Sequence, residues 1–211
     1  MSSYKLIYFD LMARAEPVRY MFELAGVEYE DNRVSQDQWK EIKATTGLGQ
    51  LPVLEVDGKQ LPQSAAIYRY VGRVHGFYPS DACECAKVDV VTETVSEFDP
   101  DLGKIFIESD QAKKADLIKT LSAEKFPKRF SILEKLLLKN NEGKQWFVGD
   151  KISLADVQVF CILHDLIPAV IGLGLGGLDL KDHPHLAAFL DRFKSEEKIS
   201  QWIKKRPVTS F

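Results

Sequence analysis

Two hydrophobic patterns divide this 211-residue chain near residue 80. Before that point, short β-branched and aromatic runs alternate with helical stripes. From Glu84 onward almost nothing repeats with period two, and the apolar residues follow helical spacing. The change of pattern predicts an α/β domain over residues 1–78 and an all-helical domain over residues 82–211.

The first part of the chain begins with a predicted strand at residues 4–9 (YKLIYF). A helical stripe follows in residues 14–26, with Pro17 in its first turn and Gly26 just past its end. Residues 27–34 alternate like a second strand. Residues 39–45 predict a short irregular helix.

A hairpin is predicted next, because Asp57-Gly58 joins the runs LPVLEV and KQLP. Ser64 is the expected N-cap of a helix whose apolar face contains Ile67 and Val71. The order is therefore β-α-β-α-β-β-α. A parallel pair joined by a helix and extended by a hairpin predicts a thioredoxin-like fold.

The second part shows helix signals only. A stripe at Phe126, Phe130, Leu133 and Leu137 predicts one helix, which Pro127 either kinks or opens. Ser153 and Asp156 form a capping box at the start of another. Pro184 is expected in the first turn of a third.

Composition and charge exclude several classes of function. The net charge of −3 gives no electrostatic reason to expect binding to nucleic acid or an anionic membrane. The N-terminus does not resemble a secretory signal, so we expect a cytoplasmic protein. The apolar stretch 157–178 is interrupted by His164, Asp165 and Pro168, which argues against a membrane span.

The cysteines and histidines predict neither a disulfide framework nor a metal site. The odd number of cysteines favours reduced thiols, and no second cysteine or histidine cluster accompanies the C-x-C pair of Cys83 and Cys85. The first domain has no C-x-x-C motif, which argues against disulfide exchange. We therefore expect no metal.

One stretch of the first domain suggests a ligand site. Pro52 cannot donate to a sheet ladder, so the backbone before it is expected at a sheet edge, where a cis Leu51-Pro52 bond would turn it toward an extended peptide. Gln63 and Ser64 stand at a helix start, which favours a carboxylate. Each feature also occurs in proteins without any ligand.

The motifs together resemble the cytosolic glutathione transferases, in particular the sigma class. The resemblance rests on separated segments in the same order: YKLIYFDLMARAEPVRYMF, WKEIK, LPVLEVDG with QSAAIYRY, SLADV and WIKKRP. It covers nearly the whole chain. It implies a homodimeric enzyme that conjugates reduced glutathione to hydrophobic electrophiles in detoxification, with no cofactor beyond glutathione.

The resemblance also implies a role for individual residues. Tyr8 would donate to the glutathione sulfur and Arg14 would add positive charge, lowering a thiol pKa of about 8.5 toward neutrality. The tripeptide would contact Trp39, Lys43, Gln50, Leu51, Pro52, Gln63, Ser64 and, from the partner subunit, Glu97 or the nearby Asp99. The hydrophobic-substrate site would draw on Phe9, Met12, Ala13, Phe106, Leu163 and Phe211, although Phe106 and Leu163 fit core packing equally well.

The sequence departs from the family pattern at Ala13, where glycine is usual, and at Leu48, where an aromatic residue is often found. Two alternative functions stay open. One is a glutathione-dependent isomerase of the prostaglandin D synthase type. The other is a carrier of haem or lipid-derived ligands, and a crystallin-like structural role is less favoured because the activating residues are present.

Overall fold

The computed structural model describes residues 2–209, which form two compact units. The first unit contains residues 2–78 together with 197–209, and the second contains residues 79–196. The final segment thus belongs to the α/β unit, whereas the sequence analysis assigned it to the helical domain. Its pattern is helical, but its apolar face packs against a helix of the first unit.

The first unit has a thioredoxin-like sheet, as predicted. Its strands have the order β2-β1-β3-β4, with β1 and β2 parallel and the other pairs antiparallel. The elements are β1 (Tyr4–Phe9), α1 (Glu16–Ala25), β2 (Glu30–Val34), α2 (Gln36–Ile42), β3 (Val53–Val56), β4 (Lys59–Pro62), α3 (Ser64–His75) and α11 (Glu197–Lys205).

Local turn chemistry explains where several of these elements end. Asp57 and Gly58 have φ angles of 49° and 76°, as a two-residue hairpin turn between paired strands requires. Gly26 ends α1 in the left-handed conformation, with φ of 68°. The predicted hairpin and the predicted end of α1 are both confirmed.

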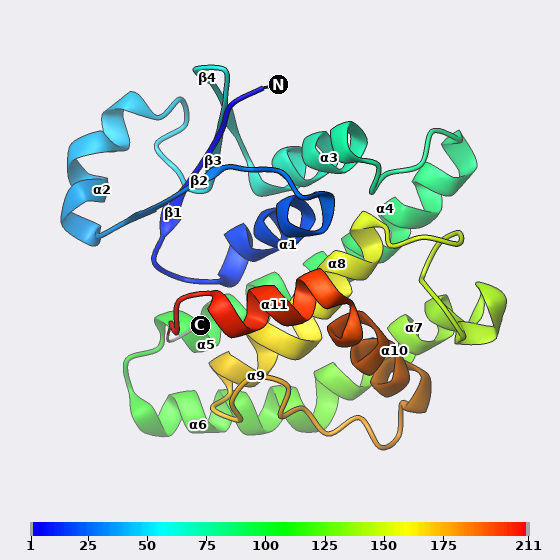
Figure 1. The fold of residues 1–211 in the computed structure, drawn as a ribbon. Helices are drawn as coiled ribbons and strands as arrows, with labels where there is room; N and C mark the ends of the chain where they lie inside the picture. Colours follow the sequence, from blue (N-terminus) through cyan, green and yellow to red (C-terminus); the bar gives the residue numbers. More distant parts are fainter. Residues whose placement is uncertain (1, 210–211) are drawn as a thin grey trace. The chain divides into compact units, whose positions relative to one another are not determined.

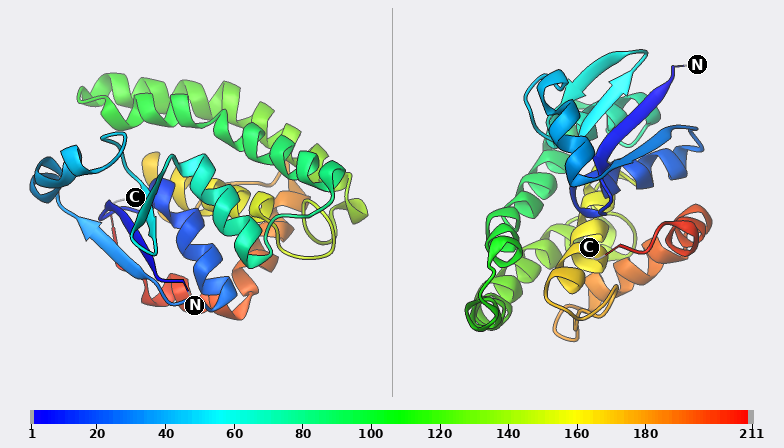
Figure 2. Two further views of the ribbon diagram at one scale, coloured as in Figure 1. Left: turned by 90° about the horizontal axis from the view of Figure 1, so that it is seen from above. Right: turned by 90° about the vertical axis from the view of Figure 1, so that its left-hand side faces the viewer.

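The sheet separates two layers of helix. Figures 1 and 2 show α1 and α3 side by side along one face, with α2 on the other. On the α2 side, Ile7, Val34 and Val53 form a buried cluster. Because side chains alternate along a strand, Leu6 and Tyr8 lie on the opposite face from Ile7.

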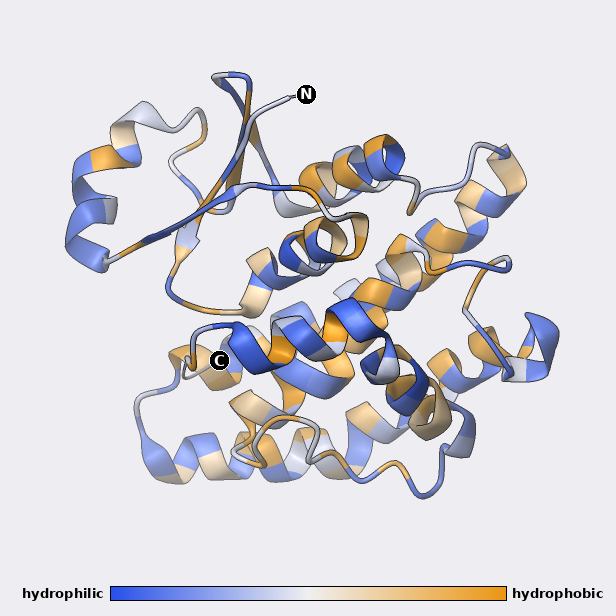
Figure 3. Cartoon of the chain, in the orientation of Figure 1, coloured by the Kyte–Doolittle hydropathy of each residue, from blue (hydrophilic) through white to orange (hydrophobic). Residues whose placement is uncertain are grey.

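Helix α11 has a narrow apolar stripe on a hydrophilic surface. Figure 3 colours most of it as hydrophilic, and its buried residues are Ile199 and Trp202. This stripe packs against α1 within the first unit. The helix is therefore held by few apolar contacts together with polar ones, among them the hydrogen bond from Trp202 to Glu16.

All the regular secondary structure described in the second unit is helical. It contains α4 (Ala82–Ser96), α5 (Asp99–Ile107), α6 (Gln111–Thr120), α7 (Phe126–Leu138), α8 (Leu154–Phe160), α9 (Ile167–Val170) and α10 (Pro184–Ser195). Pro127 lies in the first turn of α7, but a π-helical turn over Leu121–Lys125 joins α6 to α7 without a break, so the proline neither opens a free-standing helix nor interrupts it. The predicted stripe from Phe126 to Leu137 is buried.

Helix α8 is almost entirely buried, and its start is fixed by the predicted capping box. The Asp156 carboxylate accepts hydrogen bonds from the backbone and hydroxyl of Ser153, at 2.8 and 2.6 Å, and from the backbone of Phe147 at 2.8 Å. Burial raises the pKa of Asp156 to about 6, against the effect of these hydrogen bonds.

None of the helices in the described part of the chain is both long enough and apolar enough to cross a membrane.

Candidate functional site

The sheet brings three of the predicted site segments to one end. The β1–β3 ladder ends at the pair Ile7 and Val53, and Val53 also pairs with Pro62 of β4. The next residues along these three strands, just beyond the ladder, are Tyr8, Pro52 and Gln63. Tyr8 and Gln63, which are 55 positions apart in the sequence, are thereby brought to the same end of the sheet, with Pro52 between them in register.

The Leu51-Pro52 bond is cis, as expected. The expected sheet edge is wrong, however, because β3 lies inside the sheet between β1 and β4. Leu51 lies instead beyond the end of the ladder, which starts at Val53. A proline fits here because the position needs no ladder donor.

Tyr8 and Phe9 diverge at the end of β1. Tyr8 is 7% exposed, and its side chain lies on the face that α1 and α3 cover. Phe9 packs with the α2-side cluster, and its ring lies edge-on to Trp39 with the centroids 6.0 Å apart. The Phe9 ring also lies 5.8 Å from the Tyr8 ring between centroids, so Phe9 contacts both Trp39 and Tyr8.

The loop after β1 carries Arg14 and is fixed by side chains that the sequence analysis did not select. The Tyr68 hydroxyl donates to the carbonyl of Arg14 at 2.7 Å, and Nη1 of Arg19 donates to the carbonyl of Leu11 at 2.7 Å. Ala13 has a φ of 30°, unusual for a residue other than glycine. The departure from glycine at this position is thus accommodated in a left-handed conformation.

Helix α3 begins differently from the prediction. Gln63 is its N-cap, with φ of 73°, and its carbonyl accepts the backbone N–H of Ile67 at 2.9 Å. Ser64 is the first helical residue, so its expected N-cap role is wrong. The unusual backbone of Gln63, which is itself exposed, presents the helix N-terminus at the end of the sheet.

The predicted contacts on the α2 side lie on a short, well-capped segment. Ser35 and Gln38 form a capping box that starts α2, with bonds of 3.2 and 2.8 Å. Trp39 is half-buried on this helix, and Lys43 is exposed in the 3-10 turn that follows. Gln50 is exposed before the cis bond.

The remaining predicted residues lie in the second unit or outside the description. Glu97 is exposed at the end of α4, and Phe106 on α5 is 49% exposed. Leu163 is completely buried, which agrees with core packing and not with a substrate-contacting wall. Phe211 lies outside the described residues.

Sequence reasoning missed a buried group of charges beneath the loop after β1. Glu16 and Arg19 of α1 are 1% and 0% exposed and lie 3.0 Å apart. Glu16 also accepts hydrogen bonds from Trp202 and Arg206, each at 2.7 Å. The spacing of Glu16 and Arg19 at i and i+3 could have indicated an ion pair, but it carries no sign of burial.

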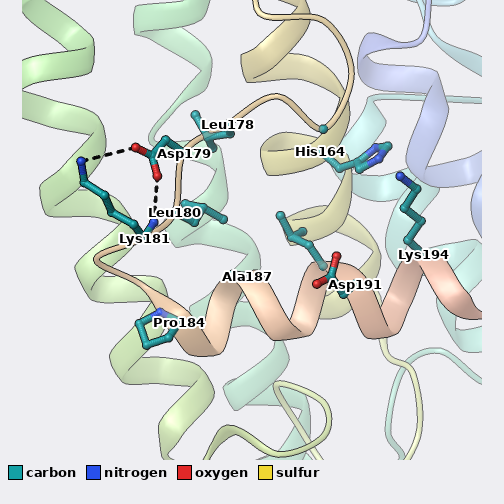
Figure 4. A pocket seen from close by; sticks show the side chains of 11 residues that line it. His164, Leu178, Asp179, Leu180, Lys181, Pro184, Ala187, Asp191 and Lys194 are labelled. Atoms are coloured by element: carbon teal, nitrogen blue, oxygen red, sulfur yellow. Dashed lines mark hydrogen bonds and ion pairs between the residues drawn. The ribbon is translucent and has the colours of Figure 1, made fainter.

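A separate pocket of about 440 Å³ lies in the second unit. Figure 4 shows Asp179 paired with Lys181 on the loop before α10, and Asp191 and Lys194 on α10. The pocket contains none of the predicted site residues, and its mixed charges favour no single ligand class. Across residues 2–209, no group of three or more histidine, cysteine or acidic side chains could hold a metal ion.

Comparison with known proteins agrees with this geometry. Residues 4–73 match the family model of the glutathione S-transferase N-terminal domain, and residues 97–206 match that of the C-terminal domain. Among curated proteins, S-crystallin SL11 of Nototodarus sloanii is 36% identical over 212 residues, with 100% of both chains covered. Glutathione S-transferase S1 of Drosophila melanogaster is 35% identical, over 98% of this chain and 80% of that protein.

Among solved structures, a prostaglandin synthase D of Nilaparvata lugens is similar, with a TM-score of 0.84 and 37% identity. The match covers 98% of this chain and 100% of that one. Family models account for both units, and these relatives match along their length. The chain therefore belongs to the glutathione S-transferase family of enzymes.

Proposed function

We propose that this protein is a sigma-class glutathione transferase that conjugates reduced glutathione to hydrophobic electrophiles. The observation that carries the proposal is the end of the sheet where Tyr8, Pro52 and Gln63 are neighbours in register. A phenolic hydroxyl, a cis-proline segment and a helix N-terminus there match the sulfur, the peptide backbone and a carboxylate of one tripeptide.

The chemistry requires a thiolate at neutral pH. A thiol with a pKa of about 8.5 is mostly protonated there, and a fall of one to two units, about 1.4 kcal/mol each, makes it largely ionised. Tyr8 supplies a hydrogen bond to the anion, and Arg14 supplies positive charge. Both stabilise the thiolate more than the thiol.

The tripeptide is held by groups of the first unit. Leu51 pairs with its cysteinyl backbone beside Pro52, and the start of α3 at Gln63 and Ser64 receives the γ-glutamyl carboxylate. Lys43 and the indole N–H of Trp39 receive the glycyl carboxylate, and Gln50 contacts the peptide. The exposure of Lys43, Gln50 and Gln63 supports these assignments because a ligand can reach them.

The protein acts as a homodimer in this proposal, with Glu97 reaching the glutathione amine of the partner subunit. Met12 and Ala13 border the second-substrate site. A cytoplasmic location belongs to the same proposal, because a reducing compartment suits both reduced glutathione and the absence of disulfides among Cys83, Cys85 and Cys161.

A second candidate function is a glutathione-dependent isomerase of the prostaglandin D synthase type. The 37% identity to the Nilaparvata lugens protein favours it, and the same thiolate would act on an endoperoxide. Product analysis with prostaglandin H2 and glutathione separates the two activities. Tight stoichiometric haem binding with negligible conjugation would instead favour the carrier role.

The decisive experiment substitutes Tyr8→Phe and measures turnover of chlorodinitrobenzene with glutathione. We expect kcat to fall about 10²-fold, as for removal of one donor to a developing anion. Tyr29→Phe is the matched control, because the Tyr29 hydroxyl is buried without a hydrogen-bond partner among the described residues. Unchanged turnover in Tyr8→Phe, or no glutathione binding by calorimetry at millimolar concentration, contradicts the proposal.

A further inference from the structure

A continuous network of ion pairs and hydrogen bonds runs through the first unit, from α11 and the residue after it to the loop that carries Arg14. Oε1 of Glu16 accepts from Nε1 of Trp202 and from Nη1 of Arg206, each at 2.7 Å. Oε2 of Glu16 accepts from Nη1 of Arg19 at 3.0 Å. The same Nη1 donates to the carbonyl of Leu11 at 2.7 Å. Two hydrogen bonds therefore separate Glu16 from the loop.

The network holds this loop at a second point. Nε of Arg19 donates to Asp31 of β2 at 3.0 Å, and Asp31 also accepts from Nε of Arg33 at 2.8 Å. Nη1 of Arg33 then donates to Asp10 at 3.0 Å. The adjacent residues Asp10 and Leu11 thus each accept a hydrogen bond from an arginine of the network, directly before the segment that carries Arg14.

Acidic and basic side chains alternate along the described part of the network. Its acidic members are Glu16, Asp31 and Asp10, and its basic members are Arg19, Arg33 and Arg206. The side chains of Glu16, Arg19 and Arg206 are 1%, 0% and 3% exposed, so none can exchange its partner for bulk water without movement of the chain. Removing one buried charge leaves another uncompensated, which forces a rearrangement.

We propose that Arg206 and Trp202 are positioning residues for thiol activation, acting through Glu16 and Arg19 on the loop that carries Arg14. This inference rests on the proposed function. The last helix contributes no atom to the reaction. Its anchor on Glu16 instead keeps Arg19 aimed at the Leu11 carbonyl, and thereby keeps the guanidinium of Arg14 at its distance from the sulfur.

The expected size follows from Coulomb's law. With an effective dielectric constant of about 20, moving a unit charge from about 4 to about 6 Å from a thiolate raises the thiol pKa by about one unit. A small displacement of the loop is therefore enough to reduce the thiolate fraction about tenfold at a pH below that pKa.

The experiment measures the pKa of glutathione bound to the full-length protein, by ultraviolet difference absorption of the thiolate across pH 5 to 9. The variants are Arg206→Met, Arg206→Lys and Trp202→Phe. Lys198→Met is the matched control, because Lys198 also joins α11 to α1 but donates to the carbonyl of Leu24 at 2.8 Å. Thermal unfolding of every variant is recorded alongside.

We expect Arg206→Met to raise the pKa of the bound thiol by about one unit. Arg206→Lys, which keeps the charge, should recover most of the shift, and Trp202→Phe should cause a smaller one. Lys198→Met should leave the pKa unchanged. If Arg206→Met does not fold, the comparison of Trp202→Phe with Lys198→Met carries the test alone.

Two results overturn the inference. One is an unchanged pKa of the bound thiol in folded Arg206→Met, or in Trp202→Phe where Arg206→Met does not fold. The other is an equal pKa shift in Lys198→Met at equal loss of thermal stability, which means a general structural effect. Failure of the proposed function looks different, because the wild-type protein itself then shows no bound thiolate at neutral pH.

Discussion

Oε1 of Glu16 lies 2.7 Å from Nη1 of Arg206, although 190 positions of sequence separate the two residues. Both side chains are almost completely buried, so this pair joins the start of α1 to the segment after α11 inside the first unit. Helices α1 and α11 share a second ion pair nearby, Glu23 with Lys205 at 2.8 Å, of which the lysine is 58% exposed. The two pairs differ mainly in burial.

This difference predicts unequal stability effects. Glu16→Gln should lower the free energy of unfolding by about 3 kcal/mol, because it leaves a buried guanidinium uncompensated. Glu23→Gln, the matched control on the same helix pair, should cost less than about 1 kcal/mol because water screens its partner. Urea unfolding followed by circular dichroism measures both, and equal losses would contradict this account.

Replacing Ala13 with glycine is expected not to lower thermal stability, unlike most alanine-to-glycine substitutions. Its φ of 30° stores about 1 kcal/mol or more of strain, which glycine relieves, whereas glycine loses about 0.5–1 kcal/mol through chain entropy. We therefore expect Ala13→Gly to leave thermal stability unchanged or slightly raised. Ala86→Gly, at an exposed position within α4, should lower it by up to about 1 kcal/mol. A similar loss of thermal stability in both variants would contradict the presence of backbone strain at Ala13.

His75 predicts sensitivity to acid. Burial lowers its pKa, and its Nε2 is buried among the described residues without a hydrogen-bond partner, next to Tyr4 and Phe22. The unfolded chain therefore binds the proton first, and stability falls as the pH drops below about 6.5, by at most about 1.4 kcal/mol per pH unit. In His75→Phe the midpoint of thermal unfolding should depend less on pH between pH 7 and 5 than it does in the wild type. An identical pH dependence in the variant would exclude His75 as its source.

Asp156 predicts a large capping effect in the second unit. Asp156→Ala leaves three buried donors without an acceptor and should cost more than about 2 kcal/mol. Asp81→Ala removes an exposed N-cap, which accepts from Cys83 and Glu84 at 2.9 and 3.0 Å, and should cost about 1 kcal/mol. Calorimetric unfolding of the two variants measures the difference.

The pH dependence of this site has a definite sign. Because burial raises the pKa of Asp156 from 3.8 to about 6, the folded state binds its proton more tightly than the unfolded state. Its contribution to stability is therefore present at low pH and is lost as the pH rises from about 4 to about 6. Asp156→Ala should not show this loss of stability with rising pH. Parallel pH profiles of stability for the variant and the wild type would contradict the role of Asp156.

Features with local causes followed from the sequence. The Asp57-Gly58 turn, the end of α1 at Gly26 and the capping box at Ser153 depend on backbone conformations and side chains a few residues apart. The boundary of α3 shows the limit of this reasoning. Serine is a common N-cap residue, which favoured Ser64. Strand β4 pairs with β3 up to Pro62, however, and Gln63 is the N-cap that connects this strand to the helix.

The sequence by itself determined the order of elements, the two patterns of burial and the family motifs that contain Tyr8, Pro52 and Gln63. Only the tertiary structure decided that these three residues are neighbours in register at one end of the β1–β3–β4 ladders, and that Arg206 pairs with Glu16. The physical reason is separation along the chain. A charged side chain is ordinarily hydrated, and the residues next to it in the sequence do not reveal the distant partner that compensates its desolvation when it is buried.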